Sequence, residues 1–143
     1  TQFMKGSQSS ELVILEQKCH IQVARSNREF GFFDQLSDTE KQELTDIHNS
    51  ILGQIELFLT KQMAAGEKCF VVFDEITYAY EYSLIDKERL LMLLQRNRET
   101  AELVLTGRQP AQELLKLADY ISEVKAVRHP YQKGISAREG IEF

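Results

Sequence analysis

Residues 69–75 read Cys69-Phe-Val-Val-Phe73-Asp74-Glu75, five apolar residues followed by two carboxylates. An apolar run of this length is typical of a β-strand that is buried on both faces of a sheet. Ligands of open parallel sheets bind just beyond the carboxyl ends of the strands, and Mg2+ prefers one or two carboxylates together with water. Asp74 and Glu75 are therefore predicted to hold Mg2+ beside bound phosphates. The alternative is an ordinary buried strand that ends at an acidic helix N-terminus.

Helix signals lie on both sides of this strand. Ser37-Asp-Thr-Glu40 is a capping box, which satisfies backbone amides at a helix N-terminus, and an apolar stripe with three- and four-residue steps follows it. This helix should end near Gly66, a residue suited to a C-terminal cap. Asp86 is the predicted N-cap of a second helix. Pro110 suits the first turn of a third helix, which should reach about residue 118.

Strand signals alternate with these helices. Besides 69–73, we predict strands at 1–5, 21–24, 103–106 and 120–127; residues 76–82 should form a short helix or turn, and 11–18 a short helix or an extended run. Such alternation implies an α/β fold, a mostly parallel sheet with helices on both faces. The sequence contains no internal repeat, linker or low-complexity segment, so residues 1–143 are predicted to form a single domain.

Composition narrows the class of protein. With 43% apolar and 27% charged residues, the 143-residue chain resembles an ordinary soluble protein. Its net charge of -5 gives no electrostatic reason to expect nucleic acid or an anionic membrane as a partner. Cys19 and Cys69 form neither a CxxC motif nor a metal cluster, and we expect buried thiols in a reducing compartment. Without a signal peptide or a membrane-length apolar run, the expected location is the cytoplasm.

Two further segments are candidates for a binding site. Thr106-Gly-Arg108 ends a predicted strand on the same side as Asp74, so Arg108 either points toward phosphates or is a solvated residue of a turn. Phe30, Phe32 and Phe33 are either core residues at a sheet edge, which the sequence itself favours, or a mobile apolar lid over a flat ligand. We regard His20 and His48 as incidental, and find no arrangement that suggests a protein nucleophile.

A nucleotide site also needs a phosphate cradle. Carboxylates at the end of a buried strand are the Walker B pattern of P-loop nucleotide enzymes, whose cradle is normally GxxxxGK[ST]. That motif is absent from the printed sequence, which begins with Thr1 in an apparent strand. We expect the first strand, P-loop and helix of the domain to lie upstream of Thr1, with that strand beside residues 69–73.

Five motifs occur together in order: Gln2-Phe-Met-Lys-Gly6, Phe73-Asp-Glu-Ile-Thr-Tyr78, Leu105-Thr-Gly-Arg108, Leu117-Ala-Asp-Tyr-Ile-Ser-Glu123, and His129-Pro-Tyr-Gln-Lys-Gly134 with Gly140-Ile-Glu-Phe143. Together they resemble the ATP:corrinoid adenosyltransferases that make adenosylcobalamin. The resemblance covers nearly the whole chain and implies a P-loop, RecA-like three-layer sandwich, here without its N-terminal P-loop segment.

The resemblance also implies a chemistry. These enzymes transfer the 5′-deoxyadenosyl group of ATP to Co(I) of cobalamin or a related corrinoid and release triphosphate. Because cobalt is the nucleophile, the protein acts mainly by positioning and electrostatics. By resemblance, Asp74 and Glu75 serve Mg2+ and the triphosphate, and Thr106 and Arg108 belong to the nucleotide site. The segment around Phe30, Phe32 and Phe33 resembles the family's corrinoid-facing segment, where apolar rings would displace the lower axial ligand. A homodimer and a flavoprotein reductant are also implied.

Two alternatives remain open from the sequence. A thymidine-kinase-like phosphotransferase also has a strand that ends in Asp-Glu, but such enzymes usually carry a zinc-binding cysteine cluster, and here two cysteines lie far apart. A domain that has lost nucleotide binding and acts only through partners is favoured by the missing P-loop and opposed by the retained Asp74, Glu75, Thr106 and Arg108.

Overall fold

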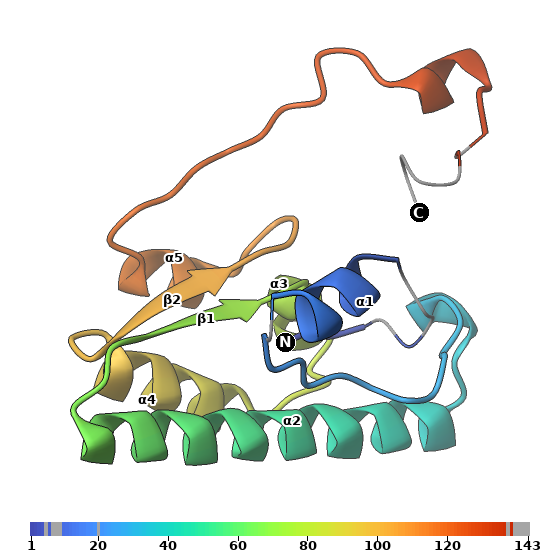
Figure 1. Cartoon of the computed structure of the whole chain (residues 1–143). Coiled ribbons are helices and arrows are strands. Elements are labelled where there is room, and N and C mark those ends of the chain that lie inside the picture. Colours follow the sequence, from blue (N-terminus) through green and yellow to red (C-terminus); the bar gives the residue numbers. More distant parts are fainter. Residues whose placement is uncertain (5, 7–9, 20, 137, 139–143) are drawn as a thin grey trace. The chain divides into compact units, whose positions relative to one another are not determined.

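The computed structural model describes all residues except 5, 7–9, 20, 137 and 139–143 (Figure 1). The chain divides into two compact units, one made of Thr1–Ser7 and Val23–Leu117 and the other of Gln8–Gln22 and Ala118–Phe143. The prediction of a single domain over 1–143 stays a prediction.

The first unit is built on a long helix, α2 (Asp38–Ala65), whose ends follow the sequence signals. The Ser37 hydroxyl accepts a hydrogen bond from the Glu40 amide at 3.3 Å, and the Glu40 carboxylate accepts one from the Ser37 amide at 2.9 Å. At the other end Gly66 adopts the left-handed conformation with φ of 69°. The capping box and the glycine cap are thus both confirmed.

The sheet of this unit has two parallel strands, β1 (Cys69–Phe73) and β2 (Ala101–Leu105). Their register runs from Cys69 opposite Ala101 to Phe73 opposite Leu105. On the other edge of β1, Gln2 forms a parallel bridge with Asp74. The extent of β1 is confirmed, whereas β2 begins before the predicted 103–106. The predicted strand 1–5 is reduced to the Gln2 bridge, and Lys5 lies outside the described residues.

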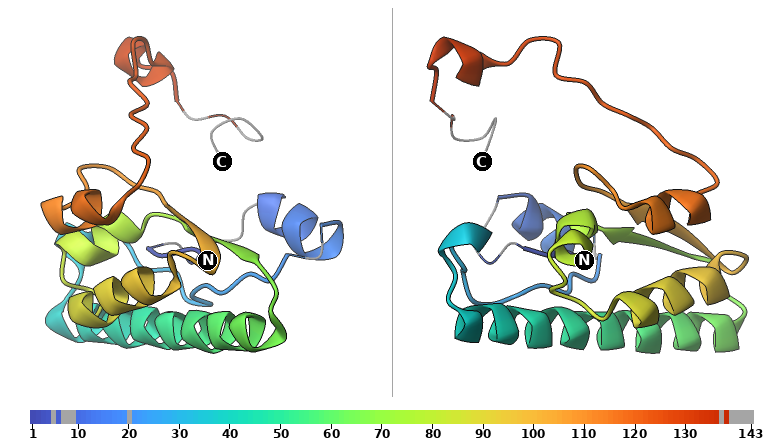
Figure 2. Two further views of the ribbon diagram at one scale, coloured as in Figure 1. Left: turned by 90° about the vertical axis from the view of Figure 1, so that its left-hand side faces the viewer. Right: turned by 180° about the vertical axis from the view of Figure 1, so that it is seen from behind.

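Only one face of β1 is buried. Val71 and Phe73 belong to the main core together with residues of α2 and of α4 (Lys87–Asn97), and both helices lie on the same side of the sheet (Figures 1 and 2). On the opposite face Phe70 is 64% exposed, and Val72 and Val104 are also exposed. The prediction of a strand buried on both faces is therefore wrong. Helices cover one face of the described pair of strands, so side chains alternate between core and surface.

Short helices connect these layers. α3 (Ile76–Glu81) follows β1 directly, and α4 begins at Asp86, whose carboxylate accepts a hydrogen bond from the Arg89 amide at 2.9 Å, as predicted. α5 (Gln112–Leu117) begins after Pro110 rather than at it, and its Leu114 enters the main core. A single 3-10 turn, η1 (Phe33–Gln35), precedes α2.

The second unit contains the helix α1 (Ser10–Gln17) and the 3-10 helix η2 (Pro130–Lys133). Residues 120–127 of this unit form no strand, and neither do residues 21–24, which the boundary between the units divides; both results are contrary to prediction. Alternation alone does not make a strand, because its backbone groups need a neighbouring ladder. Val124 is 97% exposed, and Cys19 is also exposed, so the prediction of a buried thiol there is wrong; Cys69 is half-buried. His20 and the motif 140–143 lie outside the described residues. No helix among the described residues is long and apolar enough to cross a membrane.

Candidate functional site

The carboxyl end of β1 holds a hydrogen-bonded group of three residues. The Thr106 hydroxyl donates a hydrogen bond to Oδ1 of Asp74 at 2.8 Å and accepts one from the Glu75 amide at 3.0 Å. Because Thr106 directly follows β2 and Asp74 directly follows β1, the parallel register brings them together. The predicted proximity of Thr106 and Asp74 is thus found in the structure, and the threonine fixes the position of the carboxylate.

Glu75 has an unusual backbone conformation. Its φ of 59° and ψ of 22° lie in the left-handed region, which costs a residue other than glycine about 1–3 kcal/mol. This conformation turns the chain sharply from β1 into α3, whose Ile76 and Thr77 are buried. The adjacent carboxylates of Asp74 and Glu75 therefore remain half-buried at the end of the strand. Local strain of this kind is common at functional sites, and no local sequence pattern predicted it.

Gly107 allows the turn after β2 to approach α3 closely. A Cβ atom at this position would lie 1.8 Å from Oγ1 of Thr77, and its φ is 142°. The same Thr77 hydroxyl donates a hydrogen bond to the carbonyl of Arg108 at 3.1 Å. The backbone of Arg108 is thus tied to α3, while its side chain is exposed at the same end of the sheet as Asp74.

The chemistry of these groups fits Mg2+. The carboxylates of Asp74 and Glu75 supply hard oxygen atoms, and no group of three or more His, Cys, Asp or Glu among the described residues forms a metal cage. Mg2+ usually keeps several waters and takes one or two carboxylates plus phosphate oxygens. Across the strands from Asp74, the side-chain oxygen Oε1 of Gln2 is buried and has no partner among the described residues. An open, oxygen-only site is what a hydrated Mg2+ requires.

The aromatic segment 30–33 has two kinds of phenylalanine. Phe33 stacks on Tyr82 with ring centroids 4.0 Å apart and an interplanar angle of 6°. Phe30 lies under the Arg28 guanidinium, 4.8 Å from its carbon to the ring centroid. Both rings pack against a small apolar cluster of Leu36, Leu44 and Leu84, whereas Phe32 is 81% exposed. The sequence left core and lid as alternatives for all three residues. In the structure Phe30 and Phe33 pack on the cluster, and only Phe32 is exposed.

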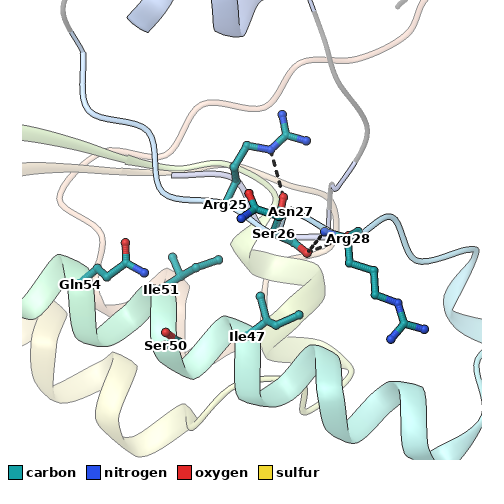
Figure 3. Close-up of a pocket in the computed structure, with 8 residues that line it drawn as sticks. All are labelled: Arg25, Ser26, Asn27, Arg28, Ile47, Ser50, Ile51 and Gln54. Atoms are coloured by element: carbon teal, nitrogen blue, oxygen red, sulfur yellow. Dashed lines mark hydrogen bonds between the residues drawn. The ribbon is translucent and has the colours of Figure 1, made fainter.

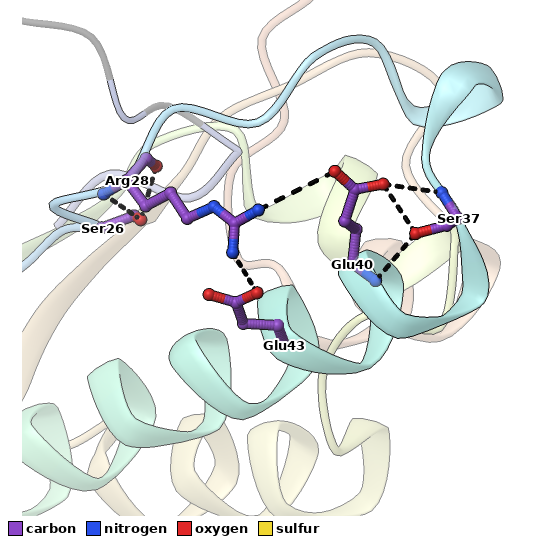
Figure 4. Close-up of polar contacts among 5 residues, drawn as sticks. All are labelled: Ser26, Arg28, Ser37, Glu40 and Glu43. Carbon is purple, nitrogen blue, oxygen red and sulfur yellow. Dashed lines mark hydrogen bonds and ion pairs between the residues drawn. The ribbon is translucent and has the colours of Figure 1, made fainter.

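Arg28 ties the aromatic segment to α2 (Figure 4). Its guanidinium forms ion pairs with Glu43 and, at 3.8 Å, with Glu40. The Ser37 hydroxyl and amide, which hydrogen-bond the Glu40 carboxylate, lower the pKa of that carboxyl group. Ser26 closes the preceding turn, because its hydroxyl donates to the Arg28 carbonyl at 2.7 Å and accepts from the Arg28 amide at 3.0 Å.

His48, which sequence reasoning treated as incidental, is 1% exposed. Nδ1 lies 2.9 Å from the Leu84 carbonyl, and Nε2 accepts a hydrogen bond from the Met4 amide at 3.3 Å, so Nδ1 carries the proton. Burial lowers the pKa of His48, against the opposing effect of the Leu84 carbonyl. The sequence signal for its burial was its place in the apolar stripe of α2, four residues after Leu44 and three before Ile51.

A pocket of about 320 Å³ lies elsewhere, between residues 25–28 and α2 (Figure 3). Its α2 wall includes Ile47, Ile51 and Gln54. None of the predicted site residues lines it. The Arg28 side chain turns away from the pocket (Figure 3) toward Glu43, and the Ser26 hydroxyl is used in its own turn. This pocket is therefore separate from the group at Asp74.

Parallel strands with a carboxylate pair at their carboxyl ends define an α/β protein with a candidate ligand site at that edge of the sheet. The family described as ATP:corrinoid adenosyltransferase BtuR/CobO/CobP matches the sequence over residues 1–143. The chain belongs to this family, as the sequence motifs indicated.

Curated relatives agree with this assignment. A corrinoid adenosyltransferase from Sinorhizobium sp is 35% identical over 85 residues, which cover 58% of this chain and 40% of that protein. Corrinoid adenosyltransferase CobA from Salmonella typhimurium is 33% identical over 73 residues, covering 51% of this chain and 37% of the relative. The Escherichia coli K12 enzyme is 29% identical over 83 residues, covering 58% and 42%. The matched part of the chain thus spans about two-fifths of each of these relatives.

Proposed function

We propose that the protein transfers the 5′-deoxyadenosyl group of ATP to Co(I) of cobalamin or a related corrinoid, with release of triphosphate. The observation that carries this proposal is the group of Asp74, Glu75 and Thr106 at the carboxyl end of parallel strands, in a chain of the ATP:corrinoid adenosyltransferase family. The family assignment favours adenosyl transfer over a thymidine-kinase-like phosphoryl transfer.

In this proposal the protein orients charges and contributes no nucleophile. Asp74, held by Thr106, and Glu75 would bind Mg2+, which would supply positive charge beside the leaving triphosphate. Arg108, exposed beyond β2, would contact the nucleotide phosphates, because a guanidinium matches their geometry. Preorganised groups of this kind need no rearrangement when charge develops in the transition state.

The aromatic segment supplies the corrinoid side of the proposal. Phe32 extends into solvent, and we assign to it the contact with the corrinoid and the displacement of the lower axial ligand. Phe30 and Phe33, which pack on the small apolar cluster, would hold the segment in place. A homodimer, a flavoprotein reductant and a cytoplasmic location complete the proposal.

The P-loop, RecA-like sandwich also belongs to this proposal. Both edges of β1 are paired at its carboxyl end, by β2 and by Gln2. The expectation that a P-loop strand lies beside 69–73 is therefore wrong for this end of the strand. The outer edge of β2 has no partner strand among the described residues, and we place the P-loop strand there.

Calorimetry with MgATP tests the proposal. The printed chain should bind MgATP weakly or not at all, because carboxylates repel triphosphate without the amides and lysine of a P-loop. A longer protein that includes a Gly-rich loop ending in Gly-Lys-Ser or Gly-Lys-Thr should bind it and form adenosylcobalamin from cob(I)alamin. Tight MgATP binding by the printed chain would overturn the P-loop part. Lack of nucleotide binding by the longer protein would favour the alternative of a domain that acts only through partners.

A further inference from the structure

Gln2 has a buried side-chain oxygen with no partner. The residue is 9% exposed, and Oε1 forms no hydrogen bond with any described residue. Its backbone, in contrast, is well paired, because its amide donates to the Ala24 carbonyl at 3.0 Å. An unpaired buried acceptor costs free energy in a folded protein. Such a group is rare enough to require an explanation, and a missing ligand is one of the standard ones.

The register of the strands shows on which face of the sheet the Gln2 side chain lies. Gln2 pairs with Asp74 in a parallel bridge, through hydrogen bonds from the Asp74 amide to the Thr1 carbonyl at 2.9 Å and from the Phe3 amide to the Asp74 carbonyl at 3.0 Å. Paired residues on neighbouring strands lie about 4.8 Å apart with their side chains on the same face. On the opposite face, the next residue, Phe3, stacks on Phe73 with ring centroids 6.4 Å apart.

Gln2, Asp74 and Thr106 therefore form a row across three adjacent chain segments, on one face and at one end of the sheet. Two members of the row are joined, since the Thr106 hydroxyl donates to Asp74. The third member, Gln2, has a buried side-chain oxygen without a hydrogen-bond partner among the described residues. We propose that Gln2 is a positioning residue of the metal site, whose Oε1 accepts a hydrogen bond from a water molecule bound to Mg2+ at Asp74.

The chemistry of the row supports this role, which rests on the proposed function. Mg2+ at one or two carboxylates keeps several waters, and the O–H groups of those waters need acceptors. A neutral amide oxygen accepts such a hydrogen bond without adding negative charge beside an incoming triphosphate. Groups that orient the ligands of a metal in this way commonly contribute 10–100-fold to metal affinity, as an order of magnitude.

The test is a titration of the printed chain with Mn2+ alone, followed by the electron paramagnetic resonance signal of the free ion. Gln2→Leu should raise the Mn2+ dissociation constant by about 10–100-fold. Its unfolding temperature without metal should be equal to or above that of the wild type, because leucine removes the unpaired acceptor. Gln2→Glu keeps an acceptor and should bind Mn2+ at least as tightly as the wild type. Gln42→Leu, a change at an exposed glutamine of α2, is the matched control.

Asp74→Asn distinguishes failure of the proposed role of Gln2 from failure of the metal site itself. If Asp74→Asn weakens Mn2+ binding and Gln2→Leu binds like Gln42→Leu, the role of Gln2 is overturned and the metal site stands. If the wild type shows no saturable Mn2+ binding, or Asp74→Asn has no effect, the metal site of the proposed function is overturned as well. If Gln2→Leu fails to fold, Gln2→Glu decides: weaker Mn2+ binding than in the wild type overturns the proposal. In the longer protein that includes the proposed P-loop, an effect of Gln2→Leu on ATP binding without an effect on Mn2+ binding would also overturn it, since Oε1 would then face the nucleotide itself.

Discussion

The carboxyl end of β1 and the aromatic segment 30–33 are held in different ways. At β1, hydrogen bonds of 2.8 and 3.0 Å join Asp74, Thr106 and Glu75. In the aromatic segment, ring stacking and the ion pairs of Arg28 hold two phenylalanines, and Phe32 extends into solvent. The first region is preorganised for a charged ligand. The second can change its exposed ring without disturbing the rings beneath it, which suits contact with a large flat ligand.

Removing a carboxylate from the first region should have the largest effect. Glu75→Ala should lower adenosyl transfer at ordinary Mg2+ by about 100-fold or more, because the triphosphate charge loses a compensating group in the transition state. The measurement is adenosylcobalamin formation in the longer protein that includes the proposed P-loop, with the unfolding temperature as a check on folding. Glu81→Ala, at the exposed end of α3, is the matched control and should leave activity unchanged. Unchanged turnover in Glu75→Ala would contradict the metal role.

A backbone change in the same region should destabilise the protein. Gly107→Ala places a Cβ atom against Oγ1 of Thr77 and forces a φ of 142° on alanine, at a cost of about 1–3 kcal/mol. Gly66→Ala is the control, because that glycine has a φ of 69° and no atom within 4 Å of the added Cβ, so only the cost of the left-handed conformation, about 1 kcal/mol, applies. Urea unfolding of both variants gives the comparison. An equal loss in the two would mean that the approach of Gly107 to Thr77 is not tight.

The sequence predicted the first region better than the second for a physical reason. The positions of Asp74 and Thr106 follow from local signals, an apolar strand and its end, and parallel pairing then brings the ends together. The backbone strain at Glu75 and the unpaired oxygen of Gln2 depend on contacts between distant segments, which no local pattern records. The same limit explains why 120–127 was wrongly predicted as a strand and why the exposed face of β1 was predicted to be buried.

For the aromatic segment, composition indicated its importance but not its arrangement. Three phenylalanines within four residues have no helix or strand period, so the sequence could not separate Phe32 from Phe30 and Phe33. Their division depends on Arg28, Tyr82 and Leu84, which come from other parts of the chain. His48 illustrates the opposite case, since its position in the apolar stripe of α2 was visible in the sequence.

Lowering the pH should weaken the contacts of His48, which link the small apolar cluster to the main core. His48 bonds Met4 and Leu84, which lie in or against the small cluster, and its ring contacts Phe3 in the main core. The folded-state pKa of His48 is lowered, so its stabilising contribution is present above the unfolded-state value of about 6.5. That contribution should be lost as the pH falls from there toward the folded-state pKa. The slope is at most about 1.4 kcal/mol per pH unit.

Urea unfolding between pH 7.5 and 5 measures this effect. His48→Gln, whose side chain does not titrate, should be less stable at pH 7.5 and should lose the part of the pH dependence that His48 causes. The same pH dependence in both proteins would assign it to other groups.

The smallest effect on stability, and the sharpest test of the comparison, comes from single changes in the aromatic segment. Phe32→Ala should alter the free energy of unfolding by no more than about 0.5 kcal/mol, because an exposed side chain loses few contacts. Phe33→Ala should cost about 1–2 kcal/mol, since its ring is half-buried against Tyr82. In the longer protein that includes the proposed P-loop, the order of the two variants should reverse for corrinoid chemistry. Phe32→Ala should reduce the four-coordinate Co(II) signal of the ATP-bound enzyme more than Phe33→Ala at a temperature where both are folded. A normal Co(II) signal in Phe32→Ala would assign the corrinoid contact to Phe30 or Phe33 instead. Phe32 would then be an ordinary surface residue.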